Sequence, residues 1–210
     1  SINGNKLSTA SAYTFDLLTD RDYVLAQFII SWQEMCNQSG IAINLKPLMQ
    51  SIYFIMNSFN IQYDLPSMMN RSIRNKKPCI HVFFNESITH LITICLTTEA
   101  YKHLLSNYGE TEHSSSVMEI IGIIQREIEE YKHHSASYLH IDDIGPGKSF
   151  KSILQRDLIL NQLHLYSISL QSILLLGKWT NTHPTISTHL TTIFKEIIQL
   201  YLDGLSIRPS

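Results

Sequence analysis

The feature that most constrains this chain is the stretch 158–177, which contains no Asp, Glu, Lys or Arg. Apolar residues recur along it at spacings of three and four, as in Ile159, Leu163 and Tyr166. This spacing is the period of an α-helix. Further leucines and isoleucines fill the opposite side, so the predicted helix is apolar nearly all round. Such a helix has no face suited to water, and we expect it inside a core or an oligomer interface.

A membrane span is the alternative interpretation of 158–177, because a bilayer needs about 20 apolar residues. Four polar side chains, however, would then lie at hydrocarbon depth, where each costs free energy unless it is paired. These are Asn161, Gln162, His164 and Gln171. We therefore expect a buried helix and no membrane partner.

The cysteines and the N-terminal residues favour a cytoplasmic location. Cys36, Cys79 and Cys95 are few, odd in number and set in apolar stretches, which is typical of free thiols in a reducing compartment. Residues 1–15 are polar and lack the apolar segment of a signal peptide.

The rest of the chain has helical periodicity as well. A second apolar helix is predicted between Pro184 and Gly204, and others are predicted at 20–37, from Pro47, from Asn85 or Glu86 to Gly109, and at 116–133. Ser116 and Glu119 form a capping box for the helix at 116–133. No stretch shows sustained two-residue alternation, so the expected fold class is all-α, with about eight or nine helices.

Motifs for chemistry are weak. GPGKS at 145–149 is similar to the end of a phosphate-binding loop, but Asp142 stands where that motif needs glycine. A histidine-rich group lacks the spacing of a helical metal site, and we interpret it as solvated. It comprises His133, His134, His140, Asp142 and Asp143. We expect no enzyme, no metal and no cofactor.

A positive cluster falls in a segment that suggests nucleic-acid binding. Arg71, Arg74, Lys76 and Lys77 lie close together with no acid between them. The surrounding stretch 47–91 predicts three short helices with tight turns, as in a helix-turn-helix unit. Lys and Arg there would bind phosphates, with His81 nearest the base edges. The alternative is that these cations only solvate a loop between core helices.

Over residues 47–205 the chain resembles the TetR family of transcriptional regulators. Ile55 and Met56 stand at the end of the family's first helix, and Met69 and Ile73 stand at apolar positions of its second. The run 76–84 corresponds to the recognition helix with its aromatic close, and 86–105 to the connecting helix. The last two predicted helices resemble the pair that forms the family's dimer interface.

The resemblance implies an N-terminal extension with one helix at 1–46, a DNA-binding unit at 47–86, and a ligand-binding and dimerisation domain at 87–210. It implies double-stranded DNA, a second copy of the chain, and a small-molecule or protein effector as partners. The implied DNA contacts are Arg71, Arg74, Lys76, Lys77 and His81. The implied pocket is lined by Ile121, Tyr131, Tyr138 and Leu163. The implied dimer contacts are Leu170, Ile173, Leu190, Ile193, Ile197 and Tyr201.

The leading hypothesis is therefore a homodimeric, cytoplasmic DNA-binding regulator controlled by a ligand. A helical interaction module that binds a partner helix in a groove is the second hypothesis. An enzyme that uses the loop 142–149 is the third.

Overall fold

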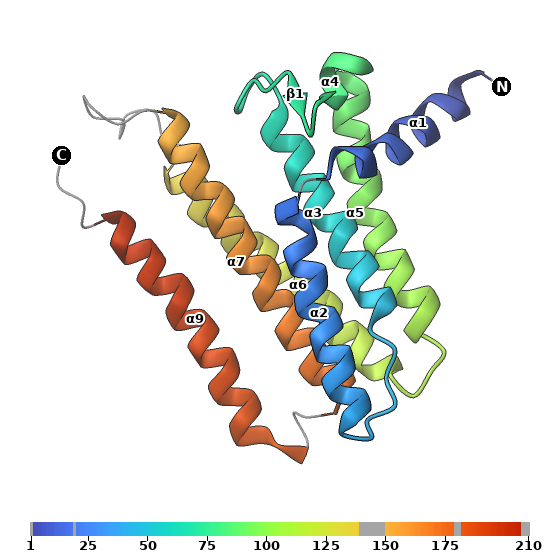
Figure 1. Cartoon of the computed structure of the whole chain (residues 1–210), viewed down its shortest axis with the longest axis vertical. Coiled ribbons are helices and arrows are strands. Elements are labelled where there is room, and N and C mark those ends of the chain that lie inside the picture. Colours follow the sequence, from blue (N-terminus) through green and yellow to red (C-terminus); the bar gives the residue numbers. More distant parts are fainter. Residues whose placement is uncertain (1, 19, 139–149, 179–181, 207–210) are drawn as a thin grey trace. The chain divides into compact units, whose positions relative to one another are not determined.

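The structure is a computed structural model that describes residues 2–18, 20–138, 150–178 and 182–206. Helices dominate the described residues, so the predicted all-α class is confirmed (Figure 1). The chain divides into two compact units, Ser1–Thr111 and Glu112–Ser210, here called unit 1 and unit 2. The boundaries expected at residues 46 and 86 both fall inside unit 1.

Unit 1 contains most of the elements, including a small antiparallel ribbon. In chain order these are α1 (Ile2–Tyr13), η1 (Thr14–Leu17), α2 (Asp20–Gln38), α3 (Lys46–Asp64), β1 (Ile73–Arg74), β2 (Lys77–Pro78), α4 (Ile80–Phe83) and α5 (Glu86–Tyr108).

The centre of unit 1 is the pair α3 and α5, which lie side by side (Figure 1). Their facing stripes follow the helical period and are fully or almost fully buried. These stripes are Leu48, Ile52, Ile55, Met56 and Phe59 on α3, and Ile92, Leu96, Ala100 and Leu104 on α5. Each fully buried Leu or Ile contributes about 1.5–3 kcal/mol relative to an exposed one, so this pair supplies much of the stability of unit 1.

The N-terminal residues join this core. Ala10 of α1 and Leu17 of η1 cluster with Ile61, Ile80 and Ile92. Because residues 1–18 are rich in Ser, Asn and Thr, the sequence predicts a loose segment there. The segment is helical instead, because α3, α4 and α5 provide apolar partners for residues such as Ala10 and Leu17.

The segment expected to form a helix-turn-helix has a different structure. After α3, which is one 19-residue helix, the chain turns, forms the β1–β2 ribbon and enters α4, which has four residues. Ile73 pairs with Pro78, and Arg74 pairs with Lys77. The ribbon turns at Asn75 and Lys76, whose φ angles of 47° and 61° are both left-handed, as a tight hairpin requires.

Unit 2 is made of three long helices, α6 (Ser114–Tyr138), α7 (Phe150–Leu176) and α9 (Pro184–Ser206). Both α6 and α9 pack on α7. Within α7, the window Ile159–Leu176 is long and apolar enough to cross a membrane, and 72% of it is buried inside the structure. The core helix of a water-soluble protein passes the same test of length and composition.

Candidate functional site

Unit 1 contains a groove along α2 and α3, formed by two adjoining pockets. The first pocket has a volume of about 330 Å³. Its walls come from α2, from the loop that follows it, and from the first turn of α3. They are Ile29, Ile30, Gln33, Ile43, Asn44, Leu45, Lys46 and Met49.

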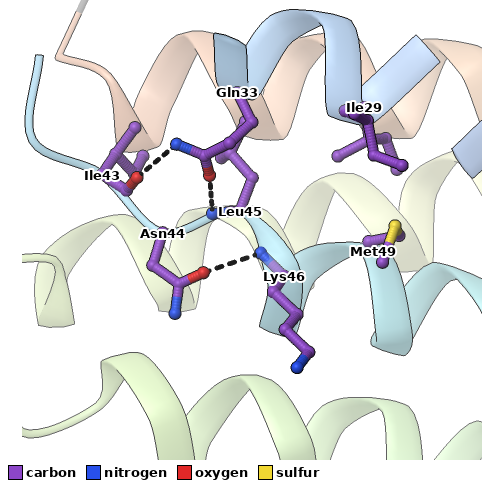
Figure 2. Close-up of a pocket in the computed structure, with 8 residues that line it drawn as sticks. Ile29, Gln33, Ile43, Asn44, Leu45, Lys46 and Met49 are labelled. Carbon is purple, nitrogen blue, oxygen red and sulfur yellow. Dashed lines mark hydrogen bonds between the residues drawn. The ribbon is translucent and has the colours of Figure 1, made fainter. Parts of the chain in front are cut away.

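Gln33 fixes the shape of this first pocket (Figure 2). Its side-chain amide donates to the Ile43 carbonyl at 2.7 Å, and its carbonyl oxygen accepts from the Leu45 N–H at 2.7 Å. One side chain of α2 thus holds two backbone groups of the loop that leads into α3. Ile29 and Met49 close the apolar side of the pocket.

The second pocket has a volume of about 450 Å³ and is formed by η1, α2, α3 and α5. It shares Ile30 and Met49 with the first pocket, so the two adjoin. Its other lining residues are Phe15, Leu18, Tyr23, Ala26, Gln27, Gln50, Tyr53, Phe54 and His103. We call the combined concavity the α2–α3 groove.

Aromatic rings shape the far end of the α2–α3 groove. Phe54 makes an edge-on contact with Phe15, with ring centroids 5.7 Å apart, and another with His103 at 6.2 Å. The His103 Nε2 atom lies 2.9 Å from the Gln50 side-chain oxygen. The end of the groove is therefore apolar, with one polar pair on its wall.

Backbone donors at the start of α3 are already engaged. The Leu45 N–H is bound by Gln33, the Lys46 N–H donates to Asn44 Oδ1 at 3.1 Å, and the Leu48 N–H donates to the Tyr108 hydroxyl at 3.3 Å. Pro47 has no N–H. A helix N-terminus attracts anions through free N–H groups. Among the described groove residues, the exposed Lys46 ammonium is therefore the main group that can meet an anion.

A second set of functional side chains lies buried in unit 2, between α6 and α7. The Glu127 carboxylate lies 2.8 Å from His164 Nδ1. Its other oxygen accepts from the Ser167 hydroxyl at 3.0 Å and from the Gln171 amide at 2.8 Å. The His164 ring lies near Tyr131, with centroids 6.1 Å apart. We call Glu127, His164, Ser167 and Gln171 the buried polar cluster.

Two opposing effects act on the Glu127 carboxyl group. Burial favours its neutral form, but the hydrogen bond and charge of His164, together with the hydrogen bonds from Gln171 and Ser167, favour the carboxylate. The net result is a pKa of Glu127 below its usual range. The cluster therefore holds a carboxylate inside the helix pair.

The residues expected to bind DNA do not form one recognition surface. Arg74 is buried and donates twice to Asp64, at 2.7 and 2.9 Å. Arg71 also lies near Asp64, at 3.7 Å. Lys77 forms an ion pair with Asp16 at 2.8 Å, and Lys76 is exposed on the hairpin turn.

His81 is half-buried in the four-residue α4. The run 76–84, expected as a recognition helix, is thus a turn, a strand and this single helical turn. A side chain that is buried in an ion pair cannot reach a phosphate, so the structure removes Arg74 from the expected contacts.

The expected ligand pocket of unit 2 consists of residues with different environments. Tyr131 is buried beside His164, whereas Ile121 and Leu163 are half-buried. The Tyr138 side chain lies outside the described residues. The structure does not test the pocket, which stays a prediction.

The expected dimer contacts divide between core and surface. Leu170 and Ile173 are buried within unit 2, and Leu190 is half-buried. Ile193 and Ile197 are 49% and 41% exposed, in line with a role at a surface. The Tyr201 side chain lies outside the described residues.

The loop 139–149, which contains the weak sequence motifs, also lies outside the described residues. The GPGKS run, His140, Asp142 and Asp143 belong to 139–149, and the His134 side chain is not described. His133 is exposed and lies 3.8 Å from Glu129 on the same helix.

No family model and no curated protein match the sequence. Among solved structures, the chain is similar in fold to an FPP/GFPP synthase from Zymomonas mobilis in its apo form. The TM-score is 0.52 and the identity is 17%, over 66% of this chain and 51% of that chain. The chain thus spans about half the length of that enzyme, and the likeness is one of fold.

The prediction of a DNA-binding regulator is contradicted. A solved structure with a similar helical fold is that of a synthase and not of a regulator. The described structure also lacks the recognition helix on which DNA binding depended. The physical cause is the Asp64–Arg74 ion pair, which commits the expected phosphate ligand to the interior.

The α2–α3 groove and the buried polar cluster were both missed by sequence reasoning. The groove is built from four elements that no local motif connects. A signal for the cluster did exist, because Glu127 interrupts the apolar stripe of Ile120 and Ile124, and His164 lies in the charge-free helix. Polar residues in such positions are rare unless they have a buried partner.

Proposed function

We propose that unit 1 binds a long apolar chain, of prenyl or acyl type, in the α2–α3 groove. The observation that carries this proposal is the pair of adjoining pockets with mostly apolar walls, which share Ile30 and Met49. Sites for small molecules are concave, largely apolar and about 300–1,000 Å³ in volume. Each of the two pockets falls in this range.

The arrangement of polar groups favours recognition of the tail over recognition of a charged head. The α3 N-terminus has its donors engaged, and Lys46 supplies one positive charge at the entrance of the first pocket. The fold similarity to an FPP/GFPP synthase adds support for a prenyl chain. A free prenyl alcohol should therefore bind about as well as its diphosphate.

The test is calorimetric titration of the full chain with farnesol and with FPP. The variant Ile30→Glu places a charge on the wall shared by both pockets, and its position is already 38% exposed. It should weaken binding at least about tenfold, because a charge in an apolar site must be desolvated. The matched control Val24→Glu, also exposed on α2 but outside the lining, should bind as the parent does.

Two outcomes decide against the proposal. Absence of binding for both ligands excludes a prenyl chain in the groove. An equal loss of affinity in Ile30→Glu and Val24→Glu shows that the introduced charge does not act through the groove. If FPP binds at least tenfold more tightly than farnesol, the recognition of the tail over the head is overturned, and Lys46→Ala then tests whether its ammonium holds the phosphate.

Turnover of such a ligand is the second candidate, favoured by the fold shared with a synthase. Release of diphosphate from FPP by the parent chain with Mg²⁺, and its loss in the groove variant Ile30→Glu, would support catalysis at the groove. The absence of release from the parent chain would leave a binding protein.

A further inference from the structure

Three side chains that can bind a metal ion lie close together in unit 2. Two of them, Glu127 and His164, are buried. One ligand atom from each of Glu127, Glu130 and His164 lies within 4.8 Å of the other two. We infer that these three side chains bind a divalent transition-metal ion of the Zn²⁺ type. The site belongs to unit 2 and does not depend on ligand binding by unit 1.

The donor set suits such an ion in chemistry and in charge. One imidazole nitrogen and two carboxylate oxygens are common ligands of Zn²⁺, and borderline metals accept this mixture of nitrogen and oxygen. Two carboxylates with a neutral imidazole also carry two negative charges, which balance a divalent cation. Hard ions such as Mg²⁺ prefer oxygen alone and are less suited to His164.

The geometry requires only a small adjustment. Ligand atoms about 2 Å from a tetrahedral Zn²⁺ lie roughly 3.3 Å apart. The Glu127 carboxylate and His164 Nδ1 lie 2.8 Å apart and share a hydrogen bond. The entering ion would replace the proton of that bond, which is released to solvent, and the two atoms would separate slightly. Glu130 is exposed, and its flexible side chain can close the remaining distance.

The two packed helices hold the site in place. Glu127 and Glu130 are three residues apart on α6, a spacing that brings both side chains to one side of a helix. His164 comes from α7, which packs against α6. Ser167 and Gln171 donate to one Glu127 oxygen, which leaves the other directed at His164. Such supporting hydrogen bonds orient metal ligands in known sites.

A second and independent observation concerns Asn161. This side chain is fully buried, and neither its oxygen nor its amide nitrogen has a hydrogen-bond partner in the described part of the chain. Buried amides are almost always hydrogen-bonded, so an orphan of this kind needs an explanation. Asn161 lies three residues before His164 on α7, a spacing that brings two side chains to one side of a helix. The proposed ion would explain the orphaned amide if a metal-bound water donated to its oxygen.

The test is a Zn²⁺ titration of the full chain after treatment with a chelator, followed by calorimetry. One ion per chain should bind. Co²⁺ in its place should give a visible absorption spectrum, which reports nitrogen and oxygen ligands directly. Glu130→Gln should weaken Zn²⁺ binding at least about tenfold without changing the melting temperature of the metal-free chain, because this side chain is exposed. The control Glu119→Gln, exposed on the same helix, should leave the affinity unchanged.

His164→Gln tests the buried ligand and should remove the Co²⁺ spectrum. If this variant does not fold, Glu130→Gln alone decides. Unchanged affinity in Glu130→Gln overturns the site. Loss of binding only in Glu129→Gln or His133→Gln would also overturn it, because the ion would then sit at the exposed pair on α6.

Discussion

The Arg74 guanidinium donates to both carboxylate oxygens of Asp64, at 2.7 and 2.9 Å, and both side chains are almost fully buried. This two-pronged contact joins the β1–β2 ribbon to the last residue of α3. The pair holds the Arg74 guanidinium in the interior, so Arg74 cannot contact nucleic acid, although Lys76 and Lys77 of the same segment are exposed.

Arg74→Met should destabilise unit 1 by about 3–5 kcal/mol, because it leaves the buried Asp64 carboxylate without its main partner. Urea unfolding followed by Trp32 fluorescence, in a Trp179→Phe background that leaves one tryptophan, measures the change. The double variant with Asp64→Asn should recover part of the loss. Lys76→Met is the exposed control and should change the free energy by less than about 0.5 kcal/mol. Similar losses in Arg74→Met and Lys76→Met would contradict the assignment.

Lys76→Gly should stabilise unit 1. Lys76 has a φ of 61°, a conformation that costs an L-residue about 1–2 kcal/mol and glycine almost nothing. Part of this gain is lost to the greater freedom of glycine in the unfolded chain, so we expect a net gain of up to about 1 kcal/mol in the same unfolding experiment. Lys77→Gly, on β2 and paired with Asp16, should be destabilising. A loss for Lys76→Gly would show that the turn is not strained.

The stability of unit 2 should depend on pH through Glu127. Its pKa in the folded chain is lowered from the ordinary 4.5, so its contribution is complete above that value and is lost as the pH falls through the folded pKa. Unfolding of the chelator-treated chain between pH 7 and 3, followed by circular dichroism, measures it. Glu127→Gln should flatten this dependence, whereas the exposed Glu119→Gln should not. Parallel curves for Glu127→Gln and the parent would refute the prediction.

The exposed apolar stripe of α9 should mediate self-association, as the sequence predicted for this helix. Ile186, Ile193, Ile197 and Leu200 are all at least 41% exposed and recur at helical spacing. Ile193→Glu with Ile197→Glu should therefore shift the chain to monomer in sedimentation equilibrium. Thr188→Glu, on the opposite side of α9, is the control. If the parent chain is already monomeric at the highest concentration, the prediction of self-association is wrong.

The helices could be predicted where their signals are local. Asn85 was expected to begin a long helix, and its side chain caps α5 by accepting from the Ile88 N–H at 2.8 Å. Pro184 begins α9 as expected. Such caps and periodic stripes depend on residues within one or two turns, so a sequence window contains all of the relevant interactions.

Features formed by distant residues could not be predicted in the same way. The β1–β2 ribbon and the single turn of α4 stand where a helix was expected at 76–84. The ribbon is held by Arg74, which binds Asp64 ten residues earlier, and by Asn75, which donates to the Leu18 carbonyl at 2.7 Å. Glu127 and His164 are 37 positions apart. The groove needs η1, α2, α3 and α5 together. Each of these exists only after the chain has packed, so no local pattern identifies it.

The reactivity of the Cys79 thiol can report local opening of the ribbon. Its thiol is buried and lies 3.4 Å from Asp64, and burial together with that carboxylate raises the pKa of Cys79 to about 12. Alkylating reagents attack the thiolate, so at neutral pH this thiol should react only in the moments when the ribbon lifts from α3. The rate of modification of Cys79, followed by mass spectrometry separately from Cys36 and Cys95, therefore reports how often the ribbon opens.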